Sequence, residues 1–221
     1  MATLTKTQIE KINLINNLTD NETIKALCNE ILYIDACNTT VKDSKFDIYK
    51  YVSRDKARER LQGVYYNNGD IVATDSYLLV VLQNQKYNPT YEGKIIGKSG
   101  EIFEGKYPNY KSIMPAKLDN YVLTQFDYNR LEEINKIDKA KVMAMQAYEK
   151  KNYIPVVKIG NAYFKLELVN KLATFMKHIG TNEIYAPGQS NKILYVKGKD
   201  GRAIVCPISS RDDAYDDAYE L

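Results

Sequence analysis

A phosphate-binding loop is the first chemistry that the residue pattern suggests. Gly93-Lys-Ile-Ile-Gly97-Lys98-Ser99 has the spaced glycines and the final Lys-Ser of such a loop. The glycines are one residue closer together than the motif needs, so the backbone amides would not close around a phosphate. The segment also follows no buried parallel strand and opens no clear helix. We therefore predict a turn between two strands.

Acid–base catalysis has few candidate groups in this chain. His178 is the single histidine, and it ends an amphipathic stretch, where it can interact favourably with the negative end of a helix. No nucleophile motif accompanies it. Asp70 and Asp75 are an odd number of strand positions apart, so they point to opposite faces and make a poor acid–base pair. We expect no catalytic residues and no enzymatic activity.

Metal and cofactor binding are not expected either. Cys28, Cys37 and Cys206 form no Cys-x-x-Cys pair, and His, Cys and carboxylate residues show no ligand spacing. Free thiols fit a reducing setting. The start of the sequence lacks the apolar region of a signal peptide, and no apolar run approaches the roughly 20 residues of a membrane helix. The predicted location is the cytoplasm, with no membrane partner.

Charge divides the chain into a basic body and an acidic end. The formal net charge of +3 includes five acids and no base after Arg211, so residues 1–211 alone carry +8. This pattern fits a polyanion-binding protein whose tail competes for the same surface. An ordinary lysine-rich protein with a solvated end fits the charge pattern as well.

The elements that would position these groups mix short helices with hairpins. Capping patterns and helical spacing predict a helical hairpin at 6–18 and 21–36, with Thr19 and Glu22 opening the second helix. Asn68-Gly69 is the pair that a type I′ hairpin turn prefers. Segment 139–151 has a mixed period that predicts neither helix nor strand. Further elements are predicted as helical turns at 54–62, strands at 77–83, 94–96, 102–103, 121–125 and 155–159, helices at 129–135 and 163–178, and a hairpin at 193–206.

The repeated mixture of hairpins and helices indicates an α+β fold. Its antiparallel sheets would be covered by helices on one face. The mixture occurs in two successive blocks, and we place the boundary between them just after Pro115, near 116–120. The predicted domains are an N-terminal helical hairpin at 1–38, a first domain at 39–118, a second domain at 119–208 and an acidic tail at 209–221.

Four segments, taken in order, carry a family resemblance. Gly63 to Val80 has a glycine-led strand before Ala-Thr-Asp-Ser-Tyr-Leu-Leu, and Tyr107 to Pro115 reads Tyr-Pro-Asn-Tyr-Lys-Ser-Ile-Met-Pro. Val157 to His178 contains Asn161-Ala-Tyr-Phe, and Ala203 to Ile208 reads Ala-Ile-Val-Cys-Pro-Ile. These segments resemble motifs of the bacterial DNA sliding clamp, the beta subunit of DNA polymerase III. The likeness covers roughly 46–115 and 119–208, in the order of the second and third clamp domains.

The resemblance implies a DNA-clamp-like fold, but the chain departs from the clamp pattern in several places. Ser76-Tyr77-Leu78 stands where the family has Gly-His-Arg, the helical hairpin replaces a first domain, and the acidic tail follows Ile208, where the family stops. These departures bear on whether the chain closes a ring.

A sliding clamp encircles double-stranded DNA and contacts phosphates through lysine and arginine without reading bases. Two clamp-like domains per chain would need a homotrimer for a complete ring, whereas a reduced monomer would keep only the partner site. Candidate DNA-binding residues are Arg54, Lys56, Arg58, Lys136, Lys139, Lys141, Lys165 and Lys171, with Arg60, Arg130 and Lys177 as further candidates. Each of them could instead be a solvated surface base.

The resemblance also implies an apolar pocket between the two domains. It would bind a short peptide of a DNA polymerase or another clamp-binding protein. Carried over by motif, its walls are Thr74, Ser76, Tyr77, Leu79, Pro115, Ile204, Val205, Pro207 and Ile208. The same residues could instead be core strand ends and strand-terminating prolines.

The predicted function is a non-enzymatic, sliding-clamp-like protein of DNA replication. One alternative is a regulatory protein-binding module with the clamp fold that does not encircle DNA. A second is a nucleic-acid enzyme whose catalytic residues form no visible motif.

Overall fold

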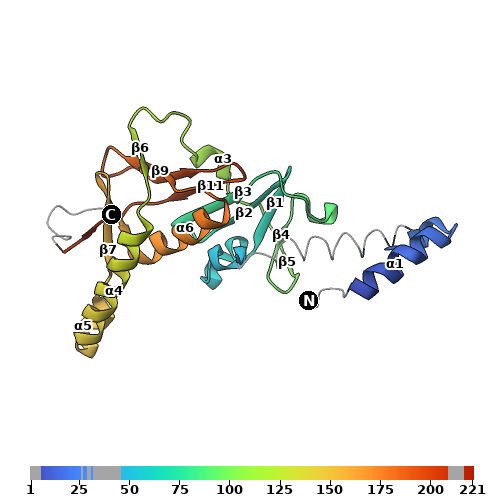
Figure 1. The fold of residues 1–221 in the computed structure, drawn as a ribbon, viewed down its shortest axis with the longest axis horizontal. Coiled ribbons are helices and arrows are strands. Elements are labelled where there is room, and N and C mark those ends of the chain that lie inside the picture. Colours follow the sequence, from blue (N-terminus) through green and yellow to red (C-terminus); the bar gives the residue numbers. More distant parts are fainter. Residues whose placement is uncertain (1–5, 26, 29–30, 32–45, 209–216) are drawn as a thin grey trace.

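The computed structural model describes residues 6–25, 27–28, 31, 46–208 and 217–221 (Figure 1). Helix α1 spans Lys6–Leu18, and the described residues 22–25, 27–28 and 31 are also helical, as predicted. The Oδ1 atom of Asn21 accepts hydrogen bonds from the backbone N–H groups of Thr23 and Ile24, at 2.9 and 3.3 Å. The predicted capping box at Thr19 is therefore wrong, because asparagine, a stronger N-cap than threonine, opens the helix. Cys37 and the remainder of 21–36 lie outside the described residues.

The first half of the body, residues 46–118, consists of short elements. It contains the 3₁₀ helices η1 (Ile48–Tyr51), η2 (Lys56–Leu61) and η3 (Pro89–Tyr91), the strands β1 (Val64–Asn67), β2 (Asp70–Thr74), β3 (Leu78–Leu82), β4 (Ile95–Ile96) and β5 (Ile102–Phe103), and the helix α3 (Tyr110–Ile113). The loop-like segment Gly93–Ser99 contributes β4 and the turn after it, so the predicted turn between strands is confirmed.

The second half, residues 119–208, has longer helices (Figure 1). Its helices are α4 (Tyr128–Ala144), α5 (Ala147–Asn152) and α6 (Leu166–His178), and its strands are β6 (Tyr121–Gln125), β7 (Val156–Ile159), β8 (Ala162–Lys165), β9 (Glu183–Pro187), β10 (Leu194–Lys197) and β11 (Gly201–Val205). A last strand, β12 (Tyr219–Glu220), lies near the C-terminus.

Strands of both halves form one antiparallel sheet of nine strands, in the order β5-β4-β1-β2-β3-β11-β10-β9-β6. The halves join where β3 pairs with β11, from Leu78 opposite Val205 to Leu82 opposite Gly201. We call this junction the seam. A smaller sheet has the order β12-β7-β8. The α+β fold class is confirmed, and the division into two domains near 116–120 stays a prediction.

The larger apolar cluster lies around α6. This helix contacts β3 and β11 of the large sheet and β7 and β8 of the small one. Leu172, Phe175 and Met176 are fully buried there. The Tyr51 hydroxyl of η1 donates to the Lys171 carbonyl at 2.9 Å, which ties the first half to this helix.

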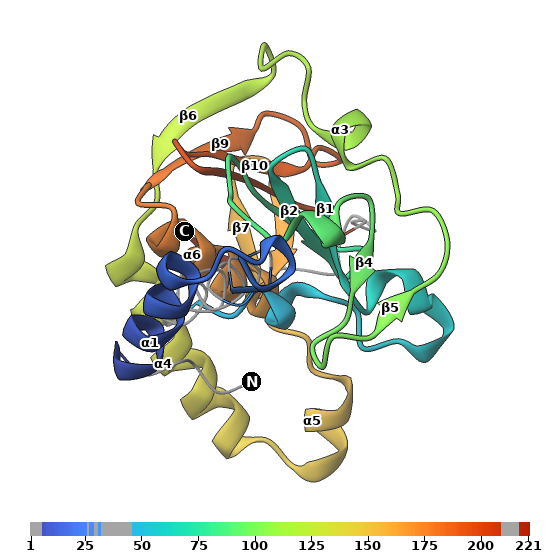
Figure 2. The ribbon, with the colours of Figure 1, turned by 90° about the vertical axis from the view of Figure 1, so that its right-hand side faces the viewer.

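The other face of the large sheet carries a smaller cluster. Leu79 and Ile204 pack there against Tyr107 and Tyr110, and Figure 2 shows the segment that carries α3 running past the strands. Alternate residues of β3 and β11 therefore face different cores, which is the period-two pattern of a strand.

The start of α6 differs from the prediction of a helix at 163–178. Tyr163 to Lys165 form β8, which pairs with β7 from Ala162 opposite Ile159 to Lys165 opposite Val156. Gly160 turns this hairpin with a φ of +60°, a conformation that favours glycine. Tyrosine and phenylalanine suit a strand, so pairing with β7 delays the helix to Leu166.

The end of α6 matches the prediction. Gly180 has a φ of +65°, and the Thr181 N–H donates to the Met176 carbonyl at 3.1 Å, which is the Schellman pattern of a helix end. His178 is the last residue of α6, and its ring stacks on Phe46 with 4.2 Å between centroids.

Several elements were missed or predicted too short. α4 extends from Tyr128 to Ala144, beyond the predicted 129–135, and α5 follows in the segment left unassigned. β9 was not predicted, although it pairs with β6 through Thr124 opposite Ile184.

The type I′ turn is confirmed, because Asn68 and Gly69 have φ values of 49° and 81°.

Candidate functional site

The seam brings the ends of three strands together. Val205 and Ile204 of β11 lie opposite Leu78 and Leu79 of β3, and Thr74 of β2 lies opposite Leu79. Beyond the strand ends, the Cys206 N–H donates to the Tyr77 carbonyl and the Ile208 N–H donates to the Tyr163 carbonyl, both at 2.8 Å. The chain therefore places the β2–β3 turn beside the segment that follows β11.

The β2–β3 turn is held by Asp75. Its Oδ1 atom accepts from the Tyr77 N–H at 3.0 Å and the Leu78 N–H at 2.8 Å. Ser76 has a φ of 82°, which is costly for a residue with a side chain. Its hydroxyl accepts from an Arg58 guanidinium N–H at 2.6 Å. The turn therefore presents Tyr77 outward from a fixed backbone.

Tyr77 is the exposed aromatic residue of the seam, with 51% of its surface accessible. The Lys165 ammonium lies 5.1 Å from the centre of its ring, a cation–π contact. Lys171 lies nearby, 3.3 Å from Asp75 and 3.1 Å from Glu167. Tyr77 therefore offers an exposed ring with the Lys165 ammonium against it, while the charge of Lys171 is balanced by two acids.

A groove of about 310 Å³ opens beside Tyr77, and we call it the seam groove. It contains four bases and three acids, so a ligand would meet mixed charges with a small positive excess. Its lining residues are Lys50, Val52, Ser53, Arg54, Asp55, Arg58, Asp75, Tyr77, Glu167 and Lys171.

The structure brings together only part of the predicted peptide pocket. Thr74, Leu79, Ile204 and Val205 are all buried, so they form the sheet core under the seam. Ser76 and Tyr77 are exposed, while Pro207 and Ile208 are half-buried. Pro115 follows Met114, which packs against the smaller cluster on the other face of the sheet. These placements leave Ser76, Tyr77, Pro207 and Ile208 as the surface that a peptide could reach.

The predicted DNA-binding bases lie in separate places. Arg54, Arg58 and Lys171 line the seam groove, and Lys165 borders Tyr77. Lys56, Arg58, Arg60 and Lys106 line a second, larger groove of about 930 Å³ between η2 and residues 104–109. Lys177 lies 4.8 Å from the ring centre of Tyr128.

The bases of α4 do not form one stripe. Lys136 pairs with Glu132 at 3.0 Å, and Lys139 is exposed. At about 100° per residue, both point away from the face that carries Arg130 and Lys141. Lys141 pairs with Asp217 of the C-terminal segment at 3.2 Å, a contact that the sequence did not signal.

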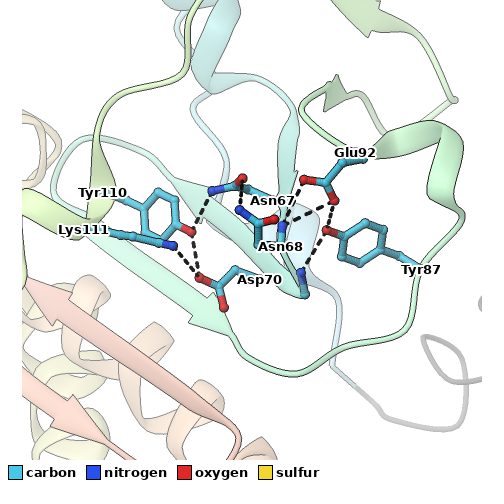
Figure 3. Close-up of polar contacts among 8 residues, drawn as sticks. Asn67, Asn68, Asp70, Tyr87, Glu92, Tyr110 and Lys111 are labelled. Carbon is cyan, nitrogen blue, oxygen red and sulfur yellow. Dashed lines mark hydrogen bonds and ion pairs between the residues drawn. The ribbon is translucent and has the colours of Figure 1, made fainter.

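Asp70 and Asp75 have separate structural roles. Asp70 accepts from the Tyr110 hydroxyl at 2.7 Å, and Lys111 lies 4.0 Å away (Figure 3). Asp75 instead caps the turn at the seam. Burial and the Asp70 hydrogen bond raise the pKa of Tyr110, which keeps its hydroxyl protonated. The expectation that the aspartates form no acid–base pair fits this arrangement.

The same network continues around the β1–β2 hairpin (Figure 3). The Tyr87 hydroxyl donates to Glu92 at 2.6 Å and accepts from the Gly69 N–H at 3.1 Å. Glu92 also accepts from the Asn68 N–H at 3.0 Å. Burial, followed by the bond to Glu92, raises the pKa of Tyr87 to about 12. These hydrogen bonds fix the β1–β2 hairpin against the segment that carries Tyr87 and Glu92.

The Cys206 thiol is not activated as a nucleophile. Cys28 and Cys206 are unpaired, and burial raises the pKa of Cys206, with the Asp75 charge adding to the effect. A protonated thiol is a weak nucleophile. Among the described residues, no group of three or more His, Cys, Asp or Glu side chains could hold a metal ion. No helix in the described ranges is long and apolar enough to span a bilayer.

This nine-stranded sheet with α6 against it defines a DNA-clamp fold. The DNA polymerase III beta sliding clamp of Bartonella birtlesii, solved with griselimycin bound, superposes with a TM-score of 0.52 at 10% identity over 73% of this chain. The beta sliding clamp of C. crescentus gives a TM-score of 0.50 at 12% identity over 82% of this chain. The chain spans 62% and 64% of those two proteins. The expected clamp-like fold is confirmed.

Sequence comparison adds no closer relation. No protein-family model matches the sequence, and no curated protein matches it significantly. The fold therefore rests on the agreement between the four sequence segments and the three-dimensional arrangement.

Proposed function

We propose that this chain is a non-enzymatic, clamp-like protein of DNA replication that tethers a partner protein at the seam. The observation that carries the proposal is the exposed Tyr77 on a rigid turn, beside Pro207 and Ile208, at the seam where β3 pairs with β11. A bacterial cytoplasm, where replication takes place, is the location that goes with this function.

The partner would be an extended peptide with one or two apolar anchors. Aromatic side chains bind such anchors well, because they offer a large apolar area with little loss of conformational freedom. Lys165 would favour acidic residues beside the anchor. A DNA polymerase or another replication protein could present such a segment in a disordered tail.

DNA binding is the second part of the proposal. Three copies of the chain would supply six clamp-like halves, which could close head to tail around a duplex. Within the described residues, β5 and β6 are the edge strands of the nine-stranded sheet, and they carry exposed apolar residues, Ile102 in β5 and Val122 and Leu123 in β6. Pairing of β5 with β6 of a neighbour would cover these edges.

Peptide binding can be tested with acetylated, fluorescein-labelled hexapeptides that carry leucine or phenylalanine at two positions. We expect Tyr77→Ala to weaken the best binder by about tenfold or more, as for a buried aromatic anchor at an interface. Ile113→Ala is the matched control, since it truncates an apolar residue of α3 that is 51% exposed, as Tyr77 is. Equal affinity of both variants for every peptide would exclude the seam as the site.

Ring closure can be tested by solution mass and by DNA retention. A ring requires the mass of three 25.3 kDa chains. It also requires retention on closed circular DNA and loss from linear DNA of the same length at high salt, because only a closed circle prevents sliding off. Equal loss from both DNA forms would rule out encirclement.

A regulatory module without encirclement is the second candidate. The exposed apolar residues of α1, Leu14, Ile15 and Leu18, favour it, because such a helix can bind a partner groove directly. This function predicts a monomer whose partner binding is lost when Leu14 and Leu18 are changed to glutamine, with DNA retention absent throughout.

A further inference from the structure

The C-terminal segment, residues 217–221, is docked on the body of the protein. Its strand β12 pairs in parallel with β7, Tyr219 opposite Val157 and Glu220 opposite Lys158. The Leu221 N–H adds a hydrogen bond to the Lys158 carbonyl at 3.2 Å. In Figure 1 the C-terminus lies beside β7 and the start of α4. The acidic end was expected to be either solvated or competing for a basic surface. Its described part, residues 217–221, has a defined position on the body.

Three basic side chains contact this segment. Lys141 pairs with Asp217 at 3.2 Å, Lys158 pairs with Glu220 at 3.3 Å, and the Arg130 Nε–H donates to the Glu220 carbonyl at 3.2 Å. Arg130 and Lys141 lie on the same face of α4, since eleven positions bring a helix back to nearly the same direction. The segment therefore runs along the face of α4 that carries Arg130 and Lys141, in the opposite direction to the helix. Arg130 also pairs with Glu133 of α4 at 3.2 Å.

An aromatic anchor holds the middle of the segment. The Tyr219 and Tyr153 hydroxyls both donate to Asp138 of α4, at 3.3 and 2.7 Å. Tyr219 and Leu221 also pack against the larger apolar cluster. The contacts are specific in position, which distinguishes this segment from a freely solvated tail.

We propose that Arg130, Lys141 and Lys158 form a binding surface for the phosphates of duplex DNA and that the C-terminal segment masks it. Carboxylates and phosphates use the same lysine and arginine donors. The five acids after Arg211 oppose a body that carries the remaining charge of +8. Duplex DNA reaches these bases when the segment leaves. The inference rests on the DNA-binding part of the proposed function.

The docking is weak enough to be displaced. Only two residues of β12 pair with β7, and the pairing is parallel, the slightly weaker arrangement. The side chains of Asp217 and Glu220 are 89% and 76% exposed, so salt screens both ion pairs. A duplex presents many phosphates at once, whereas the segment presents two carboxylates here. Because the segment is part of the chain, it returns when the DNA dissociates.

The test compares two full-length variants of equal net charge. Asp217→Asn with Glu220→Gln removes the carboxylates that meet the bases, while Asp212→Asn with Asp213→Asn removes the same charge from residues outside the described part. Binding is measured by fluorescence anisotropy on a short linear duplex at several salt concentrations. A short open duplex cannot retain a ring, so the assay reports direct contacts alone.

We expect the first variant to bind the duplex about tenfold more tightly at low salt. Its plot of log K against log salt is expected to be steeper by about two to three, as for up to three added phosphate contacts. The control variant is expected to gain much less affinity for the duplex. Adding Lys141→Gln and Lys158→Gln to the first variant removes most of the gain, and thermal unfolding confirms that each variant is folded.

Several results would overturn the inference. Equal gains in duplex affinity in both neutralised variants would show that the effect comes from net charge alone. No gain in the variant with Asp217→Asn and Glu220→Gln would show that the bases do not contact phosphates. A change in solution mass without a change in DNA affinity would assign the segment to a second copy of the chain. If no variant binds duplex DNA, the inference fails, while peptide binding at the seam and retention on circles remain separate tests of the proposed function.

Discussion

The Lys165 ammonium lies over the ring of Tyr77, 5.1 Å from its centre, and this contact joins the two halves across the seam. Lys165 is the last residue of β8 and precedes α6, so its backbone is fixed by a hairpin and a helix. Tyr77 is fixed by the turn that Asp75 caps. The rigid backbones on both sides make the exposed pair a preformed surface.

Coupling between these two side chains can be measured directly. A double-mutant cycle with Lys165→Met and Tyr77→Leu is expected to give an interaction free energy of about 0.5 kcal/mol, as for an exposed cation–π pair. Urea unfolding of the four proteins supplies the numbers. Strictly additive losses would mean that the ammonium does not interact with the ring in solution.

Ser76 offers a test of backbone strain at the seam. Ser76→Gly relieves the positive φ, and Ser76→Ala keeps it, while both lose the hydrogen bond from Arg58. We expect the glycine variant to be more stable than the alanine variant by about 1 kcal/mol. Thermal unfolding ranks the two, and the reverse order would show that the turn does not need a left-handed residue.

His178 predicts a specific pH dependence. Burial lowers its pKa from the ordinary value of 6.5, so the unfolded chain binds a proton more readily than the folded one. Its contribution to stability is therefore complete above about pH 7 and is lost as the pH falls towards the folded pKa. In His178→Phe, which keeps a ring against Phe46, this loss disappears. Urea unfolding between about pH 7.5 and 5 detects the difference between the two proteins.

The Tyr110 hydroxyl is expected to stabilise the first half. Tyr110→Phe removes its bonds to Asp70 and Asn67, and Asp70 is left partly buried with Lys111 alone. The expected loss is about 1–2 kcal/mol in the free energy of unfolding. Tyr185→Phe is the control for removing a hydroxyl elsewhere on the same sheet. If the free energy of unfolding falls equally in the two variants, the hydrogen bond to Asp70 does not stabilise the protein.

Gly63 is expected to tolerate no side chain. A Cβ there would lie 2.7 Å from Ile95 Cγ2 and 2.9 Å from the Ile96 carbonyl oxygen. Because the backbone of β4 cannot move away easily, Gly63→Ala should cost about 1–3 kcal/mol, as for an overpacked core. Chemical denaturation measures this cost, and an unchanged midpoint would place β4 further from β1 than described.

Local signals made much of the fold predictable. The Asn68-Gly69 turn and the hairpin at 193–206 depend on a few neighbouring residues, and both formed. The boundary of α6 was wrong, because Tyr163 and Phe164 suit either a strand or the first turn of a helix. Their pairing with β7 decides the outcome, and helical periodicity cannot reveal that pairing.

The candidate sites depend on contacts that no local pattern encodes. Asp217 meets Lys141 across 76 positions, and Lys171 meets Asp75 across 96. The family motifs placed Tyr77, Ile204 and Val205 in one predicted pocket, and they did not separate exposed Tyr77 from the two buried residues. That distinction depends on which face of each strand meets α6 or Tyr107.

The nine-stranded sheet has a consequence for dissecting the protein. All five residues of β3 are buried, and β11 supplies the hydrogen bonds along one side of that strand. A fragment that ended near residue 118 would lack β11. The leucine and valine residues of β3 would then form an unpaired, solvent-exposed sheet edge. Such a fragment should precipitate or self-assemble, so the two halves can be studied only as an intact pair.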